Sequence, residues 1–234
     1  MDTLKKAAAL AALDLIPNNA VVGLGSGSTL RYFIQELGAR VRSGQLHVVG
    51  VPTSYQSHFL AKESGVSLLD PMDVASVDIT VDGADEIDPA GNLIKGGGGA
   101  HVMEKLIAAM AKQFVIVADE TKPVQVLGAR TAVPIEVITP ALAFVMKKLR
   151  EFGGQPQIRS SNGKLGPVIS DLGHPILDVK FDAITDAAQL SQQLNAIPGI
   201  VGHGLFVGMA DQALIARSPV DSPTIETRHL VRAR

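Results

Sequence analysis

Residues 20–29 read AVVGLGSGST and join a strand, a loop and the start of a helix. The apolar run from Ala20 to Leu24 predicts a buried strand. The segment Gly25–Ser28 predicts a loop, since glycine and serine are turn residues. A helix is expected from about Thr29, because apolar residues then recur at helical spacing: Leu30, Phe33, Ile34, Leu37 and Val41. A buried strand that leads through a loop into a helix is the repeating unit of an α/β fold.

The same alternation continues on both sides of this segment. An alanine-rich helix from about Leu4 to Leu15, capped by Asp2 or Thr3, precedes it. Further strands are expected at 47–51, 66–69, 77–81 and 114–118, with helices at 54–63 and 101–111. Alternating strands and helices predict a mostly parallel sheet with helices on both faces. Ligands of such sheets bind at the carboxyl ends of the strands.

The pattern changes after about Gly128. A strand is expected at 133–138 and a helix from Thr139-Pro140, followed by short strands near Gln157, Val168 and Leu177. A helix capped by Thr185 and a strand near Val201 complete the series. This order resembles the ferredoxin-like α+β motif, so a second, smaller domain is expected. The polar tail after Asp221 is expected to fray.

The composition excludes several classes of protein. Apolar residues make up 46% of the chain and charged residues 19%, which is enough for a real core and argues against disorder. A net charge of -2 gives no sign of a nucleic-acid or anionic-membrane partner. The absence of cysteine excludes disulfides, thiolate metal sites and cysteine nucleophiles. With no secretory leader and no apolar run of about 20 residues, a soluble cytoplasmic protein is expected.

The loop after the first strand is a candidate phosphate site. Glycines let backbone N–H groups approach an anion, and the following helix N-terminus adds donors and positive partial charge. Ser26, Ser28 and Thr29 add hydroxyl groups. The loop is not a Walker A motif, and Leu30 stands where a dinucleotide fingerprint needs its third glycine. The alternative is a tight turn with a serine cap.

A second loop, residues 82–88, carries four carboxylates in the sequence DGADEID. Such crowding is costly unless cations, donors or a substrate offset it. An EF-hand is excluded because Ala84 occupies a ligand position. A magnesium site and a solvated acidic turn both stay open, because carboxylates suit hard cations.

A third loop joins Lys95 to four glycines, Gly96–Gly99, with Glu104 about one turn into the next helix. Consecutive glycines fit a backbone that takes unusual dihedral angles or touches a ligand. Glu104 alone is equally well explained as a first-turn glutamate favoured by the helix dipole. Lys122 adds a cation after the strand that ends at Ala118. The histidines show no metal-site spacing, and no Gly-x-Ser-x-Gly hydrolase motif is present.

In order, these segments resemble the motifs of type A ribose-5-phosphate isomerases. The resemblance rests on Gly25–Thr29, Asp82–Glu86, Lys95–Ala100 with Glu104, Ala118-Asp119 with Lys122, Asn195–Val201 and Gly204–Phe206. Each motif alone is weak, but the ordered set is specific and spans nearly the whole chain. Two departures are Ser26 in place of a frequent threonine and Val102-Met103 in place of a Thr-Arg pair. Any role of that arginine is lost here.

The resemblance implies interconversion of D-ribose 5-phosphate and D-ribulose 5-phosphate through an enediolate, in the non-oxidative pentose phosphate pathway, with no cofactor or metal. Glu104 is implied as the base, with Asp82, Asp85 and Lys95 as further catalytic residues. The implied substrate-binding residues are Ser26, Gly27, Ser28, Thr29, Asp82, Gly83, Ala84, Asp85, Lys95, Gly96, Gly97, Gly98 and Lys122.

The fold implied is α/β: a Rossmann-like, mostly parallel sheet domain with an inserted smaller α+β domain of ferredoxin-like type. The Rossmann-like catalytic domain would cover 1–130 and be completed by 206–234, and a lid or oligomerisation domain would cover 131–205. A homodimer, or a tetramer, is implied, with a small sugar phosphate as the only partner. Two rivals stay open: a non-catalytic sugar-phosphate sensor, and another sugar-phosphate isomerase or deaminase.

Overall fold

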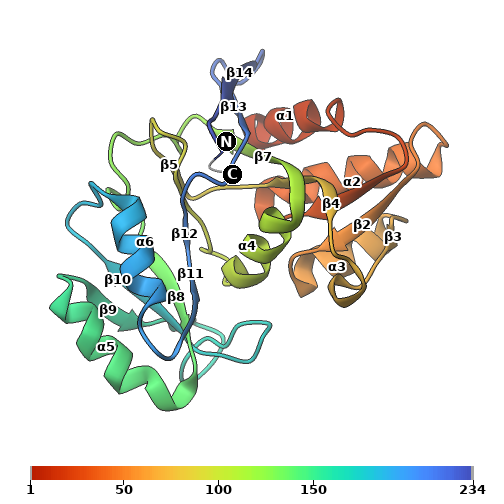
Figure 1. The fold of residues 1–234 in the computed structure, drawn as a ribbon. Helices are drawn as coiled ribbons and strands as arrows, with labels where there is room; N and C mark the ends of the chain where they lie inside the picture. The colour runs from red at the N-terminus through yellow and green to blue at the C-terminus, as the bar shows by residue number, and fades with distance from the viewer. Residues whose placement is uncertain (1, 233–234) are drawn as a thin grey trace. The chain divides into compact units, whose positions relative to one another are not determined.

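The computed structural model describes residues 2–232 (Figure 1). The chain divides into two compact units. The first combines the chain up to Ala84 with Met103–Lys122 and the chain from Gly208 onward. The second combines Asp85–Val102 with Pro123–Val207. Within the described residues, no helix is both long and apolar enough to cross a membrane.

The first unit contains a seven-stranded sheet with the order β14-β13-β7-β4-β1-β2-β3. Six strands run parallel, and only β14 at one edge is antiparallel. The strands are β1 (Ala20–Leu24), β2 (Val48–Pro52), β3 (Ser67–Leu68), β4 (Val77–Asp82), β7 (Ala111–Asp119), β13 (Gln212–Arg217) and β14 (Thr224–His229). The expected mostly parallel sheet is therefore confirmed.

Helices cover both faces of this sheet, as expected. The core beneath α1 (Asp2–Leu13) and α2 (Ser28–Arg42) includes Val22 and Leu24 of β1. Val21 instead joins a smaller cluster with Ile107 of α4 (His101–Met110) on the opposite face. This alternation follows from the two-residue period of a strand. The remaining helices are α3 (Tyr55–Glu63), which follows β2, and a 3₁₀ turn at Pro71–Asp73.

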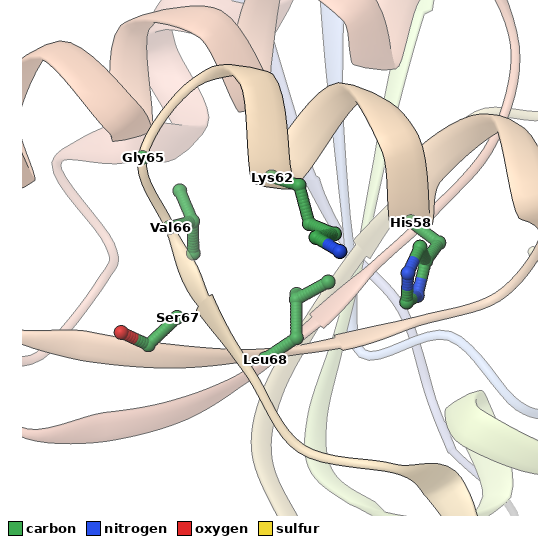
Figure 2. A pocket seen from close by; sticks show the side chains of 6 residues that line it. All are labelled: His58, Lys62, Gly65, Val66, Ser67 and Leu68. Atoms are coloured by element: carbon green, nitrogen blue, oxygen red, sulfur yellow. The ribbon is translucent and has the colours of Figure 1, made fainter.

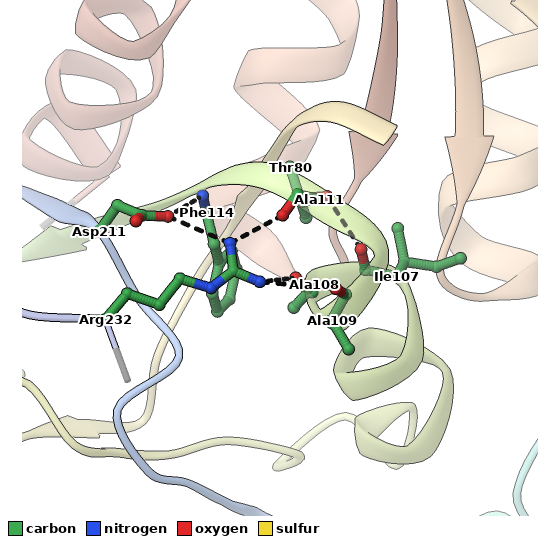
Figure 3. Close-up of polar contacts among 8 residues, drawn as sticks. All are labelled: Thr80, Ile107, Ala108, Ala109, Ala111, Phe114, Asp211 and Arg232. Carbon is green, nitrogen blue, oxygen red and sulfur yellow. Dashed lines mark hydrogen bonds and ion pairs between the residues drawn. The ribbon is translucent and has the colours of Figure 1, made fainter. Parts of the chain in front are cut away.

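The tail after Asp221 forms regular structure within the described residues, which end at Arg232, so the expectation that it frays is wrong there. Residues Thr224–His229 form β14, which pairs with β13 over six residue pairs. Beyond the strand, Arg232 donates to the carbonyl oxygens of Ala111 (2.7 Å), Ala108 (3.1 Å) and Ala109 (3.5 Å) (Figure 3). Polar composition was misleading because an edge strand with one solvent-facing side is naturally polar.

The Arg232 side chain also forms an ion pair with Asp211 at 3.3 Å, and Asp211 accepts the Phe114 N–H at 2.7 Å. The last carbonyl groups of a helix have no partner within the helix, so a cation there is favourable. The tail thus caps the end of α4, the helix that carries Glu104.

We expect Arg232→Ala to lower the free energy of unfolding by about 1–3 kcal/mol, the cost of losing hydrogen bonds from a charged donor. Urea unfolding would measure this change. Arg232→Lys, which keeps the charge without the forked geometry, should fall between the wild type and Arg232→Ala. An unchanged midpoint for Arg232→Ala would contradict the capping role.

The second unit contains a four-stranded antiparallel sheet with the order β11-β8-β10-β9. Its elements follow the chain as β8 (Val133–Val137), α5 (Leu142–Glu151), β9 (Gln155–Ile158), β10 (Ile176–Lys180), α6 (Ala187–Asn195) and β11 (Ile200–His203). This is the expected ferredoxin-like order of strands and helices. The apolar sides of α5 and α6 pack on one face of the sheet, around Val145, Leu149 and Leu194.

Three local expectations for this unit are wrong. No strand forms near Val168, where only an isolated bridge joins Ile169 to Pro175. Positive φ angles at Gly166 (87°) and Gly173 (89°) flank that segment and turn the chain. Helix α6 is capped by Asp186 in place of Thr185, because the Asp186 carboxylate accepts the Gln189 N–H at 2.8 Å. Helix α5 begins after a 3₁₀ turn at Thr139–Ala141, later than expected.

A small three-stranded sheet in the second unit was not anticipated. It has the order β12-β6-β5 and consists of β5 (Glu86–Ile87), β6 (Leu93–Ile94) and β12 (Leu205–Phe206). Strands of two residues carry too little periodicity to be read from sequence. This sheet connects the end of the acidic loop to the start of the glycine run, and its three strands belong to the second unit.

Candidate active site

Three predicted loops follow neighbouring strands of the first unit. Strands β7, β4 and β1 are adjacent and parallel. Their carboxyl ends are continued by residues 119–122, 82–84 and 25–29 respectively. The first unit therefore carries these predicted residues along one edge of its sheet, where α/β proteins bind ligands.

The loop after β1 is fastened to Asp82, at the end of β4. Asp82 is fully buried, and its Oδ1 accepts the N–H groups of Ser26 (3.2 Å) and Gly83 (2.7 Å). Gly25 lies so close that a Cβ atom there would come within 2.3 Å of Asp82 Oδ1. Only glycine fits at position 25 without displacing the carboxylate. Asp82 thus orders both loops in addition to any role with a ligand.

Polar groups surround the same loop on its other side. The Ser26 hydroxyl lies 2.9 Å from Thr53 Oγ1 and 2.6 Å from Ser54 Oγ, while the Gly27 N–H donates to Gln56 Oε1 at 2.9 Å. Gly27 has a φ of 100°, a conformation that L side chains rarely adopt. The loop is therefore held in one shape at the N-terminus of α2.

Lys5 is a candidate that the sequence patterns did not reveal. Its ammonium group lies 3.1 Å from the Ser28 hydroxyl, although the two residues are 23 positions apart. Lys5 sits on α1, which packs beside α2. It brings a cation to a loop whose own residues are all neutral. Only tertiary packing reveals this, because a lysine in an amphipathic helix is otherwise unremarkable.

Glu104 lies in the first turn of α4 and is only 4% exposed. One turn further on, Ile107 packs against Gly23 and its carbonyl oxygen accepts from Thr80 Oγ1 at 3.3 Å. Helix α4 then leads directly into β7, which begins at the amino edge of the sheet. This direction places Glu104 toward the carboxyl edge, the same edge as Asp82.

The next residue, Lys105, has a pKa below the ordinary value for lysine. Burial lowers the pKa of its ammonium group from 10.5 to about 7. Between these two values the unfolded chain holds a proton that the folded chain has released. Stability therefore rises with pH across this interval and is flat, at its lower level, below about pH 7.

We expect Lys105→Met to be more stable than the wild type below pH 7, because no buried charge then opposes folding. The advantage should shrink as the pH rises from 7 toward 10.5. Urea unfolding of both proteins at pH 6 and pH 9 would measure it. A difference that is equal at the two pH values would contradict the lowered pKa.

Lys122 closes the loop after β7. Its N–H donates to the Asp119 carbonyl at 3.1 Å, and the Asp119 carboxylate accepts the Thr121 N–H at 2.9 Å. Asp119 is buried, and Lys122 is half-buried. The loop is thus a turn closed by its own aspartate, with the lysine at the carboxyl edge of the sheet.

The second unit holds the other predicted residues. Asp85 pairs with β6 through its N–H, which donates to the Ile94 carbonyl at 2.8 Å, and its Oδ2 accepts the Gly97 N–H at 2.9 Å. Lys95 is 3% exposed, and its ammonium group lies 5.4 Å from the centre of the Phe206 ring. This contact is a cation–π interaction. Asp85, Lys95 and the glycine run are therefore one connected set.

At least two positions of the glycine run require glycine. Gly96 has a φ of 102°, and a Cβ there would come within 2.6 Å of the His101 side chain. Gly99 has a φ of 82° and a Cβ there would approach Ile176 to 3.1 Å. Gly97 and Gly98 are exposed, and the Gly97 N–H is bound to Asp85.

The carboxylates of the acidic loop have separate hydrogen-bond partners. Glu86 belongs to the second unit, and its carboxylate accepts the N–H groups of Gly128, Arg130 and Thr131, each at 2.7 Å. Asp88 binds Asn92. Within residues 2–232, no three histidine or acidic side chains are grouped as metal ligands. Each of the four acids therefore accepts backbone N–H groups at a different place.

A cavity of about 470 Å³ lies elsewhere on the first unit, at the edge of the large sheet. It is lined by His58 and Lys62 of α3 and by residues 65–68 (Figure 2). None of the predicted site residues lines it. Neither His58 nor Lys62 belongs to a motif noted in the sequence, and this cavity has no part in the site proposed below.

Comparison with known proteins finds relatives that match this chain over nearly its whole length. A family model described as ribose 5-phosphate isomerase A (phosphoriboisomerase A) matches residues 49–219. A ribose-5-phosphate isomerase A from Thermosynechococcus vestitus is 48% identical over 223 residues, which cover 95% of this chain and 94% of the relative. One from Methanothermobacter thermautotrophicus is 51% identical, with 92% and 94% covered.

The chain belongs to the ribose 5-phosphate isomerase A family. Solved structures of ribose-5-phosphate isomerases match its fold as well. One, in complex with phospho-erythronic acid, has a TM-score of 0.91 at 40% identity, covering 96% of this chain and 98% of the other. Another, from Methanocaldococcus jannaschii, has a TM-score of 0.90 at 40% identity, with 97% and 98% covered. The resemblance noted in the sequence is thereby confirmed at the level of the family.

Proposed function

We propose that this chain interconverts D-ribose 5-phosphate and D-ribulose 5-phosphate, with Glu104 as the group that moves the proton between C2 and C1. Membership of the ribose 5-phosphate isomerase A family over nearly the whole chain is the observation that carries the reaction. The buried Glu104, at the carboxyl edge of the large sheet, supports the assignment of the base.

The phosphate group is assigned to the loop Ser26–Thr29, with Lys5 and Lys122 as cations. Backbone N–H groups at the start of α2, together with the hydroxyl groups of the loop, are suitable donors for a phosphate. The Lys5 ammonium already lies beside Ser28. A relative's structure with phospho-erythronic acid, a sugar-acid phosphate, supports a sugar phosphate as the ligand class.

The chemistry at C1 and C2 is assigned to carboxylates and donors that the family resemblance brings together. Aldose–ketose isomerisation through an enediolate needs a base near the two carbons and donors at the oxygen that gains charge. Glu104 is the base; Lys95 and the N–H groups of the glycine run are the donors. Asp82 and Asp85 handle the hydroxyl protons and the opening of the ring. These residue roles are proposals, as is the absence of any cofactor or metal.

The remaining proposals concern the setting of the enzyme. Residues 131–205 are proposed as a lid or oligomerisation domain, and a homodimer or tetramer as the assembly. A cytoplasmic location and a place in the non-oxidative pentose phosphate pathway are proposed together with the reaction. No nucleic-acid or membrane partner is proposed.

One coupled assay tests the function and separates its rivals. The purified chain is incubated with ribose 5-phosphate, arabinose 5-phosphate or glucosamine 6-phosphate, each with and without a chelator. Rapid conversion of ribose 5-phosphate alone, unaffected by the chelator, is expected. Preference for another sugar, or binding without turnover, would favour a different isomerase, a deaminase or a sensor. Activity lost to the chelator and restored by magnesium would reinstate the acidic loop as a metal site.

A further inference from the structure

One arginine of the second unit holds the glycine run from one side. Arg159 follows β9 directly, and its Nη1 donates to the carbonyl oxygens of Gly96 (3.0 Å) and Gly97 (3.1 Å). Its Nε and Nη2 donate to the two carboxylate oxygens of Asp178, at 2.9 and 2.5 Å. The side chain is only 13% exposed. One planar group therefore joins β10 to two consecutive peptide units of the glycine run.

These contacts fix the direction of two backbone N–H groups. The C=O and N–H of one trans peptide unit point in opposite directions. The Gly96 carbonyl shares its peptide unit with the Gly97 N–H, and the Gly97 carbonyl shares its unit with the Gly98 N–H. Because Arg159 binds both carbonyl groups, both N–H groups point away from it.

The two N–H groups differ in their hydrogen-bond acceptors. The Gly97 N–H donates to Asp85 Oδ2 at 2.9 Å. Within residues 2–232, the Gly98 N–H has no hydrogen-bond acceptor. Gly98 is exposed, and a Cβ there would meet nothing within 4 Å. The Gly98 N–H is thus an aligned donor with room for a ligand in front of it.

We propose that Arg159 is a positioning residue, which aligns the Gly97 and Gly98 peptide units so that the Gly98 N–H donates to the substrate oxygen that gains charge. This inference rests on the proposed function. A cation bound to a carbonyl oxygen also strengthens the N–H of the same peptide unit as a donor. Asp178 keeps the guanidinium in the required plane, because it binds two of its nitrogens in parallel.

Lysine cannot replace this arrangement. A single ammonium group is a point donor, whereas the guanidinium reaches a carboxylate with one edge and two carbonyl groups with its remaining nitrogen. Arg159→Lys therefore preserves the charge and most of the volume but releases the glycine run. A purely structural arginine would instead change stability and leave the chemical step alone.

The test compares Arg159→Lys with Arg150→Lys, a matched change at an exposed arginine of α5. Initial rates with ribose 5-phosphate give kcat and KM. Inhibition by phospho-erythronic acid, known as a ligand of a relative, is compared with inhibition by inorganic phosphate. For Arg159→Lys, kcat is expected to fall on the order of 10- to 100-fold. This is less than the 10²–10³-fold that removal of an oxyanion donor costs, because the Gly98 N–H is misaligned and not removed. Inhibition by phospho-erythronic acid should weaken, while inhibition by phosphate should not change.

Two further measurements guard against a merely structural effect. Arg159→Gly should regain activity when millimolar guanidinium is added, because the ion can occupy the vacated site. Asp178→Asn should show a smaller loss of kcat in the same direction, and it stands in as the test variant should Arg159→Lys fail to fold.

The outcomes separate this inference from the proposed function. An inactive wild-type chain would overturn the function itself. With an active wild type, kcat of Arg159→Lys within about twofold of the wild-type value would overturn the role of Arg159. A loss explained entirely by the unfolded fraction, or an equal weakening of both inhibitors, would overturn it as well.

Discussion

Replacing Glu104 with glutamine is expected to remove most turnover and leave the fold intact. Glutamine has nearly the same shape as glutamate but cannot accept a proton from carbon. A positioned general base contributes about 10²–10⁴-fold to a rate, so kcat should fall on the order of 10³-fold. Initial rates with ribose 5-phosphate would give kcat, and thermal unfolding would confirm that the variant is folded.

The structure offers a matched control for this change. Glu36 lies on α2, is exposed and belongs to none of the predicted loops. Glu36→Gln removes the same charge and should retain wild-type kcat. Turnover of Glu104→Gln close to that of Glu36→Gln would remove Glu104 from the role of base.

Gly25→Ala is expected to have the second largest effect, because it acts on two loops at once. The added Cβ would lie 2.3 Å from Asp82 Oδ1 and 2.6 Å from the Val81 carbonyl oxygen, so Asp82 or the loop must move. Overpacking of this kind costs about 1–3 kcal/mol of stability. Misplacing site residues by about 1 Å can cost 10²-fold in rate, and kcat/KM should fall on that order.

Gly163→Ala is the matched control, because a Cβ at Gly163 would meet nothing within 4 Å. It should change neither the unfolding midpoint nor kcat/KM. Wild-type stability and kcat/KM in Gly25→Ala would show that the Asp82 carboxylate can move at no cost. Its role in fastening the loop of residues 25–29 would then be wrong.

The sequence predicted the large sheet well because its signals are local. Ala20–Leu24 is a continuous apolar run, Val77–Val81 alternates apolar and polar residues, and α2 has a clear helical period. The ferredoxin-like order of the second unit was also predictable, although one of its expected strands, near Val168, is absent. Glycine and proline around that segment compete with strand formation.

The sequence could not predict contacts that depend on tertiary packing. Lys5 and Arg159 lie far along the chain from the groups that they contact, the Ser28 hydroxyl and the Gly96 carbonyl, and neither belongs to a motif. The tail was misjudged for a related reason, since β14 gains its partner from β13 and Arg232 gains its acceptors from α4. Sequence motifs therefore identify candidate ligand-binding residues more readily than they identify the residues that hold those residues in position.

Deuterium incorporation tests most directly whether Glu104 moves the proton between C2 and C1. Ribose 5-phosphate is converted in D₂O by the wild type and by Glu104→Gln, and the label at C1 of ribulose 5-phosphate is followed by NMR. We predict that the wild type introduces deuterium at C1 and that Glu104→Gln, although folded and able to bind phospho-erythronic acid, does not. Incorporation by Glu104→Gln at the wild-type rate would contradict the account.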